Sequence, residues 1–188
     1  GLSEQKGEEL WEMCGRFGGY GFNRAQSYAY RMVTMQTAYI RTYYPMEFFA
    51  ALLTAGQAAD LQTYVNDIRR QGFEVKPVDV NLSGASPRIE GNGIRLPLTA
   101  VKGIGPSAVE KVLAHQPYAS FVDFLLDSGT SKTIADVLIR TGSFHDLEPG
   151  VSVATLVLRH EAFRGDKRLS HKKNRDLVRP TLDAIQGP

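Results

Sequence analysis

A glycine-containing turn at residues 101–105 is the stretch of this sequence whose residue types best fit a chemical task. It reads Val-Lys-Gly-Ile-Gly and is followed by Pro106, which suits the first turn of a helix because a missing N–H costs nothing there. Glycines let the backbone approach another surface closely, and the free N–H groups at the start of a helix attract anions. Lys102 and Lys111 flank the turn, and Ser107 adds a hydroxyl group. Because an anion that repeats along a partner is a phosphate, the stretch predicts contacts to a nucleic-acid backbone, which carry no base information.

Gly103, Ile104 and Gly105, with Val101 before them, resemble the helix-hairpin-helix motif, in which apolar residues precede and separate two glycines. The resemblance implies that the hairpin binds the DNA backbone. The structural alternative is a glycine-closed turn between two packed helices, which binds nothing. The predicted first phosphate site consists of Lys102, Gly103, Ile104, Gly105, Ser107 and Lys111.

A second turn, Thr-Gly-Ser-Phe at residues 141–144, also lies between two helical patterns. We interpret it as a degenerate hairpin of the same kind, with one glycine instead of two. This interpretation predicts a second phosphate site formed by Arg140, Thr141, Gly142 and Ser143.

Side chains suited to catalysis or metal binding are scattered along the sequence. Cys14 is the only cysteine, which excludes a disulfide framework and a thiolate metal site and fits a reducing compartment. An independent enzyme is therefore the least favoured class of function. We expect surface or core roles for the scattered histidines and aspartates, which are His115, His145, His160, His171, Asp79, Asp123, Asp127 and Asp136.

Positive charge is concentrated near the C-terminus. The whole chain has a net charge of +2, but residues 159–179 contain eight basic and three acidic side chains. We expect a mobile tail over residues 164–188, with at most a turn or two of helix, whose charge adds affinity for nucleic acid without specificity. No run approaches the ~20 apolar residues of a membrane span, and no signal peptide is visible, so we expect a cytoplasmic protein.

Apolar periodicity predicts a mainly helical fold. Two short strands, at 88–90 and 94–96, are expected to pair as a hairpin with Asn92-Gly93 in its turn. The helix at 24–44 is unusually aromatic, and we expect most of its tyrosines to fill a core. The expected helices cover residues 3–17, 24–44, 46–54, 58–71, 106–113, 120–126, 132–140 and 152–163.

Residues 20–24, Tyr-Gly-Phe-Asn-Arg, open a series of matches that runs in one order along the chain. The series continues through Tyr-Pro-Met-Glu-Phe at 44–48, Pro-Val-Asp-Val-Asn at 77–81 and Leu-Ile-Arg-Thr-Gly-Ser-Phe-His at 138–145. It is similar to the fingers and following region of the bacterial replicative DNA polymerase, the alpha subunit of DNA polymerase III (C-family).

The resemblance implies three parts. Residues 1–98 would be a helical fingers-type domain that ends in the small β-hairpin, and residues 99–148 a tandem helix-hairpin-helix DNA-binding domain. Residues 149–188 would be a C-terminal helix and the basic tail.

The resemblance also implies a role for the start of the 24–44 helix. In the family this stretch faces the phosphates of the incoming nucleotide, which makes Asn23, Arg24 and Gln26 candidate nucleotide contacts. Arg24 keeps a positive charge, whereas Ala25 and Gln26 stand where the family has serine and histidine. The palm carboxylates that bind Mg²⁺ lie upstream in the family, so the resemblance implies no catalytic residue, metal or cofactor in this chain and no polymerisation by it alone.

These observations predict sequence-independent binding to duplex or primer-template DNA by a fragment or relative of that polymerase subunit. The alternative is a protein-interaction module that complements or inhibits a replicative polymerase. In that case exposed aromatic side chains of the 24–44 helix would form the interface.

Overall fold

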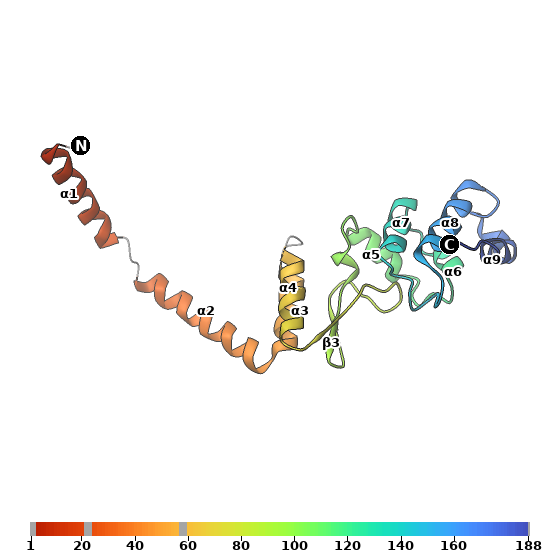
Figure 1. Ribbon diagram of the computed structural model, residues 1–188, viewed down its shortest axis with the longest axis horizontal. Coiled ribbons are helices and arrows are strands. Elements are labelled where there is room, and N and C mark those ends of the chain that lie inside the picture. The colour runs from red at the N-terminus through yellow and green to blue at the C-terminus, as the bar shows by residue number, and fades with distance from the viewer. Residues whose placement is uncertain (1–2, 21–23, 57–59, 188) are drawn as a thin grey trace. The chain divides into compact units, whose positions relative to one another are not determined.

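The computed structural model describes residues 3–20, 24–56 and 60–187 of the chain. It divides into two compact units, Gly1–Pro45 and Met46–Pro188. Helices dominate both units, and a small three-stranded sheet lies in the second (Figure 1). The expected mainly helical fold with a small β-hairpin is therefore confirmed.

The first unit contains α1 (Glu4–Tyr20) and α2 (Arg24–Tyr43). α1 continues through Gly18, where the sequence predicted a break. A glycine costs a helix only about 1 kcal/mol relative to alanine, which is too little to end it. α2 stops just before Pro45, as predicted, because the residue that precedes a proline resists the helical conformation.

Large side chains of the first unit are exposed. The exposed fraction is 81% for Trp11 and 71% for Tyr28, and the rings of Tyr39 and Tyr43, tilted against each other with centroids 4.6 Å apart, are also exposed. None of the buried core residues described in the chain comes from residues 3–45. The expectation that most tyrosines of α2 fill a core is wrong, because helical spacing identifies an apolar face without showing what covers it.

Two helices, α3 (Pro45–Ala55) and α4 (Leu61–Arg70), lead to the sheet of the second unit. Phe49, Ile68 and Ile94 are fully buried in a small core between them and the sheet. The predicted 46–54 helix forms, and Phe49 is the residue of it that is fully buried. The start of the predicted 58–71 helix falls partly on residues 57–59, which lie outside the described residues.

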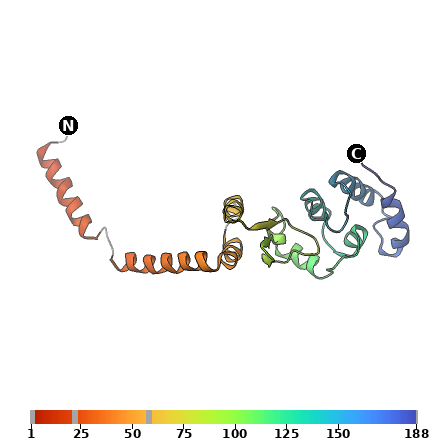
Figure 2. The same cartoon turned by 60° about the horizontal axis from the view of Figure 1, so that its bottom comes forward.

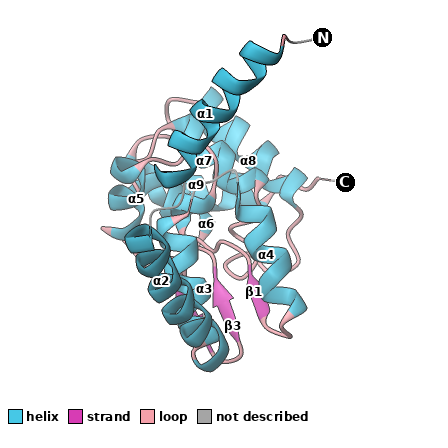
Figure 3. Ribbon diagram, turned by 90° about the vertical axis from the view of Figure 1, so that its left-hand side faces the viewer, coloured by secondary structure: helices cyan, strands magenta, loops and turns pink. Residues whose placement is uncertain are grey.

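The sheet has the strand order β1-β3-β2, with β1 (Glu74–Lys76) parallel to β3 (Gly93–Arg95) and β2 (Arg88–Glu90) antiparallel to β3. Figure 3 shows β1 beside β3. The predicted hairpin forms, but its turn consists of the two residues between Glu90 and Gly93, one position earlier than Asn92-Gly93 suggested. Gly93 pairs with Glu90 on one side and with Glu74 of β1 on the other, and a Cβ at Gly93 would lie 2.9 Å from the Glu74 Cβ. β1, for which no strand was predicted, is thus a third strand that lies close to Gly93.

The main core of the second unit lies among the helices that follow the sheet. Phe124 and Phe144 pack edge to face with ring centroids 4.9 Å apart, and Phe121 packs on Phe144 in the same way at 5.1 Å. Val80 and Leu156 belong to the same core, so it draws on residues from both sides of the expected boundaries at 98 and 148. The elements around it are η2 (Leu98–Ala100), α5 (Pro106–Leu113), α6 (Phe121–Asp127), α7 (Lys132–Arg140) and α8 (Val153–Gly165).

Side-chain hydrogen bonds fasten the loop after β1 to the connection between α5 and α6. The amide of Asn81 donates to the Tyr118 carbonyl at 2.9 Å and accepts from the Tyr118 N–H at 2.8 Å. The amide of Gln116 donates to the Val80 carbonyl at 2.6 Å. Segments more than 30 positions apart in sequence are therefore fixed to each other.

The C-terminal segment is ordered rather than a mobile tail. It forms η3 (Lys172–Asn174) and α9 (Arg175–Asp183), which packs on α6 and α8 (Figures 1 and 2). Val178 and Leu182 are fully buried there, and Arg175 makes ion pairs with Asp123 and Asp127. The expected turn or two of helix is present as α9, but the expectation of a mobile tail is wrong because the apolar side chains of α9 pack into a core with α6 and α8.

Candidate nucleic-acid interface

The turn at 101–105 is anchored by buried apolar residues and exposes its tip. Val101 and Ile104 are buried in the main core, whereas Lys102 and Gly103 are exposed at the tip. Gly103 has φ +92°, a value that glycine reaches without steric cost. Gly105 is the N-cap of α5, and its carbonyl accepts from the N–H groups of residues 108 and 109 at 3.0 and 3.1 Å. The apolar residues thus hold the turn while its polar backbone faces outward.

The start of α5 is as predicted. Pro106 occupies the first helical turn, and Ser107 and Lys111 are exposed on the helix. The N–H groups of this turn carry the positive end of the helix dipole.

The start of α7 repeats this geometry, and sequence reasoning missed it. Ser131 is the N-cap, and its Oγ accepts a hydrogen bond from the Ile134 N–H at 3.3 Å. Gly129 has φ +63° and lies two residues before its cap, as Gly103 lies two residues before Gly105. Glycine two positions before a capping residue is the signal that could have identified residues 128–131 as a hairpin between α6 and α7.

The two helix starts meet at one open hollow. It is lined by residues 105–108 and Lys111 from the α5 side and by Thr130, Ser131 and Ile134 from the α7 side. Lys132, the first residue of α7, is exposed next to Ser131. The positive ends of two helix dipoles and nearby lysines therefore converge on the same place, which favours an anion.

The turn at 141–144 has a different structure. Gly142, with φ +75°, donates its N–H to the Ile139 carbonyl at 3.0 Å, and the Ser143 N–H donates to the Leu138 carbonyl at 3.1 Å. These hydrogen bonds close the C-terminus of α7 in a Schellman motif. The expected tight hairpin is absent because residues 144–152 intervene before α8 begins at residue 153.

The polar side chains of this turn form hydrogen bonds within the turn and to the last residues of α7. The Thr141 hydroxyl donates to the Val137 carbonyl at 3.0 Å and lies 3.0 Å from the Ser143 Oγ. Ser143 is fully buried, and its carbonyl accepts from the Val80 N–H at 2.8 Å. A phosphate contact by Thr141, Gly142 or Ser143 stays a prediction.

Arg140 is exposed at the end of α7 and pairs with Asp136, one turn earlier, at 2.8 Å. This hydrogen bond lowers the pKa of Asp136 and raises the pKa of Arg140. The guanidinium is therefore partly neutralised by its own helix. Its predicted phosphate contact also stays a prediction.

The candidate nucleotide contacts belong to the first unit. Asn23 lies outside the described residues, and Arg24 begins α2 with its side chain outside what the structure describes. Gln26 is exposed on the first turn of α2. A nucleotide contact by these residues stays a prediction.

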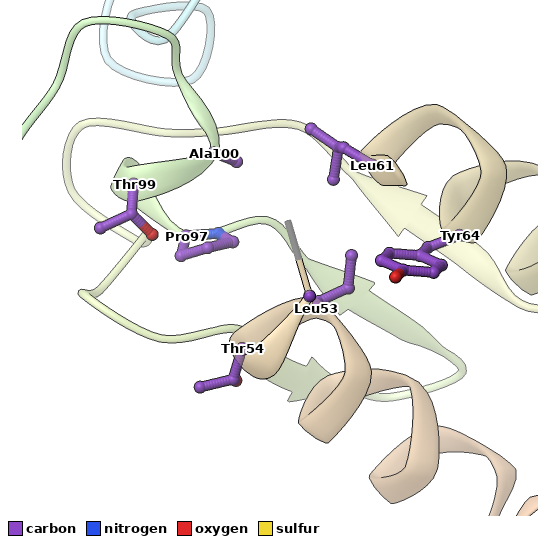
Figure 4. Close-up of a pocket in the computed structure, with 8 residues that line it drawn as sticks. Leu53, Thr54, Leu61, Tyr64, Pro97, Thr99 and Ala100 are labelled. Carbon is purple, nitrogen blue, oxygen red and sulfur yellow. The ribbon is translucent and has the colours of Figure 1, made fainter. Parts of the chain in front are cut away.

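A further hollow lies between α3, α4 and η2 (Figure 4). Its lining is largely apolar, with Leu53, Leu61 and Pro97, and the Tyr64 hydroxyl beside it donates to Asp60 at 3.4 Å. Its lining therefore suits the packing of apolar groups rather than catalysis.

Across residues 3–20, 24–56 and 60–187, no three His, Cys, Asp or Glu side chains come together as a metal site would require. No helix in these ranges has the length and apolarity to span a bilayer.

The geometry agrees with what the chain resembles. Residues 72–153 match the family model of the helix-hairpin-helix motif, which includes both residues 101–105 and residues 128–131. The chain is 35% identical over 153 residues to the DNA polymerase III subunit alpha of Deinococcus radiodurans and 34% identical over 152 residues to that of Thermus aquaticus, matches that cover 77% and 76% of this chain. The subunit of Neisseria meningitidis serogroup B is 29% identical across 99% of it.

This chain spans only a small part of the relatives it matches. The shares of those three subunits are 12%, 12% and 17%. The chain is thus homologous over most of its length to one region of DNA polymerase III alpha subunits and contains a helix-hairpin-helix motif.

Proposed function

We propose that this chain binds duplex or primer-template DNA through the phosphate backbone, without reading base sequence, as a fragment or relative of a DNA polymerase III alpha subunit. The observation that carries the proposal is the hollow where the starts of α5 and α7 meet. The homology to replicative polymerase subunits supports the choice of DNA as the anion.

The contacts follow from the groups that face the hollow or its rim. Backbone N–H groups at Gly105 and Ser107 would bind one phosphate, with Gly103 and Ile104 shaping the turn and Lys102 and Lys111 supplying charge. For a second phosphate we propose Thr130, Ser131 and Lys132 at the start of α7 in preference to residues 140–143 at its end. A helix start offers donors, whereas a helix end offers carbonyl oxygens that repel an anion.

Binding of a fluorescent duplex, followed by anisotropy over a salt series, tests this proposal. Gly105→Val suits the test because Gly105 has an extended backbone and a Cβ there meets no atom within 4 Å. The added side chain should keep the fold but prevent the close approach of a phosphate. Loss of one charge-assisted hydrogen bond, worth about 1.5–3 kcal/mol, weakens binding about tenfold or more.

Gly7→Val in α1 is the matched control, because a Cβ there also meets no atom within 4 Å. It should leave duplex affinity unchanged. If the unaltered chain does not bind duplex near physiological salt, or if Gly105→Val binds as well as the unaltered chain, the hairpins are only scaffold.

A second candidate function is an interaction module for the remaining parts of a replicative polymerase. The exposed side chains of α2, among them Tyr28, Met35 and Tyr43, favour this candidate. Co-purification with a polymerase polypeptide that contains the palm would support it, and loss of that complex on Tyr28→Ser and Tyr43→Ser would place the interface on α2. Under either candidate, residues 1–98 would act as part of the fingers, in the cytoplasm, with nucleotidyl transfer performed elsewhere.

A further inference from the structure

A second basic surface lies on the loop between α8 and α9, residues 166–174. Lys167, Arg168, His171 and Lys173 line a shallow hollow there together with Asn174, and no carboxylate lines it. The loop lies beyond the residues that match the helix-hairpin-helix family model. It is next to α9, at the end of the second unit away from α5 (Figure 1).

The loop is fixed by its own hydrogen bonds and by the protein core. Leu169 is buried and packs against Val178 in a small core shared by α6, α8 and α9. The Asn174 side chain donates to the Arg168 carbonyl at 2.7 Å, and the Lys173 N–H donates to Nδ1 of His171 at 3.3 Å. A loop held in this way loses little conformational entropy when it binds a ligand.

The cations of this region divide into two groups by their partners. Arg168 pairs with Asp166 at 2.8 Å, and Lys172 pairs with Asp127 of α6 at 3.4 Å. Arg175 also binds Asp127, and these contacts hold the pKa of that carboxyl below its usual range. One of these ion pairs links two residues of the loop, and the other attaches the loop to α6.

Lys167 and Lys173 form the other group. Both are exposed, and among the described residues neither makes an ion pair. His171 lies between them in sequence; with Nδ1 accepting from the backbone, a neutral ring carries its proton on Nε2 and can donate to an anion. Two uncompensated ammonium groups and an N–H donor are thus presented at one fixed hollow.

We propose that Lys167, His171 and Lys173 form a separate site for the nucleic-acid phosphate backbone. The inference rests on the proposed function, since it requires that this chain binds nucleic acid. Lysine ammonium groups are point charges that suit a repeating, variably oriented phosphate. The residues that line the hollow include no apolar side chain, whereas a lipid surface or an amphipathic peptide needs one.

The test compares the salt dependence of duplex binding by the full chain and by K167S/K173S. Each phosphate contact that is lost lowers the slope of log K against log salt by about 0.9, so the double variant should lower it by about two. R69S/R70S is the control, because it removes the same charge from exposed residues of α4. The control should leave the slope unchanged. An unchanged slope in K167S/K173S, or an equal reduction in the control, would overturn the proposal.

Nuclear magnetic resonance of the His171 ring separates nucleic acid from a free anion. Duplex should shift the ring signals over the concentrations at which anisotropy reports binding, and inorganic phosphate at the same phosphate concentration should not. Equal shifts with inorganic phosphate would overturn the assignment to nucleic acid.

The two proposals can fail separately. If the unaltered chain does not bind duplex, both are overturned. If binding falls with Gly105→Val while the slope in K167S/K173S matches that of the unaltered chain, only the site on the α8–α9 loop is overturned.

Discussion

The hairpins at 101–105 and 128–131 and the turn at 141–144 each contain a glycine with positive φ next to a helix, yet they leave opposite groups available. Gly103 and Gly129 precede α5 and α7, whose first N–H groups remain as donors. Gly142 follows α7, and its turn uses N–H groups to satisfy the last carbonyls. The comparison teaches that such a glycine leaves helix N–H donors available only when a helix begins after it.

The sharpest test of this comparison replaces two glycines by alanine, one that precedes a helix (Gly103, before α5) and one that follows a helix (Gly142, after α7). Gly103→Ala and Gly142→Ala both force alanine into the left-handed region, and each should lower the free energy of unfolding by about 1–2 kcal/mol. Denaturant unfolding measures this cost. Only Gly103→Ala should also weaken duplex binding per folded molecule. Equal loss of binding in the two variants would show that the closed turn contributes to the interface.

A smaller effect is expected from the caps. Ser131 and Ser152 are exposed serines that cap α7 and α8, accepting from the N–H three residues later at 3.3 and 3.1 Å. Replacement of either by alanine should lower stability by about 1 kcal/mol, measured by denaturant unfolding. Ser131→Ala should also weaken duplex binding, because Ser131 lines the hollow. The idea that α7 supplies the second phosphate site would be refuted if Ser131→Ala bound duplex as well as the unaltered chain does.

A further effect on stability depends on pH and on His160, which lies on α8 away from both turns of α7 in sequence. His160 of α8 is buried, its Nδ1 has no hydrogen-bond partner among the described residues, and burial lowers its pKa, with the charge of Arg164 adding to the effect. Below about pH 6.5 the unfolded chain therefore takes up a proton that the folded chain resists, and stability falls as pH falls. Through this one group, the free energy of unfolding can change by at most about 1.4 kcal/mol per pH unit. Unfolding of the unaltered chain and His160→Phe between pH 7 and 5 measures it, and identical slopes would exclude this cause.

Local signals in the sequence predicted much of this structure. Pro106 placed the start of α5, Ser120 the start of α6, and apolar spacing placed α7 and α8 within a few residues. These features depend on residues close together in the chain, where capping and periodicity act.

What the sequence did not predict depends on distant residues. The meeting of Ser107 with Ser131 at one hollow, the approach of β1 to Gly93, and the burial of Val178 against α6 each require the folded arrangement. The second phosphate site is predicted at residues 140–143 from one glycine between two helical patterns, and such a glycine does not by itself show whether it ends the helix before it or precedes the next one.

The paired hydrogen bonds between Asn81 and Tyr118 have a practical consequence for dissecting the molecule. A polypeptide cut to start at residue 99 would retain every predicted hairpin residue, yet it would lack Asn81 and the Val80 side chain that fills the main core. The backbone N–H and carbonyl of Tyr118 would then lose their Asn81 partners, and the hairpin turns would lose part of the core against which they pack. The minimal folding piece that carries the hairpins should therefore begin upstream of β1.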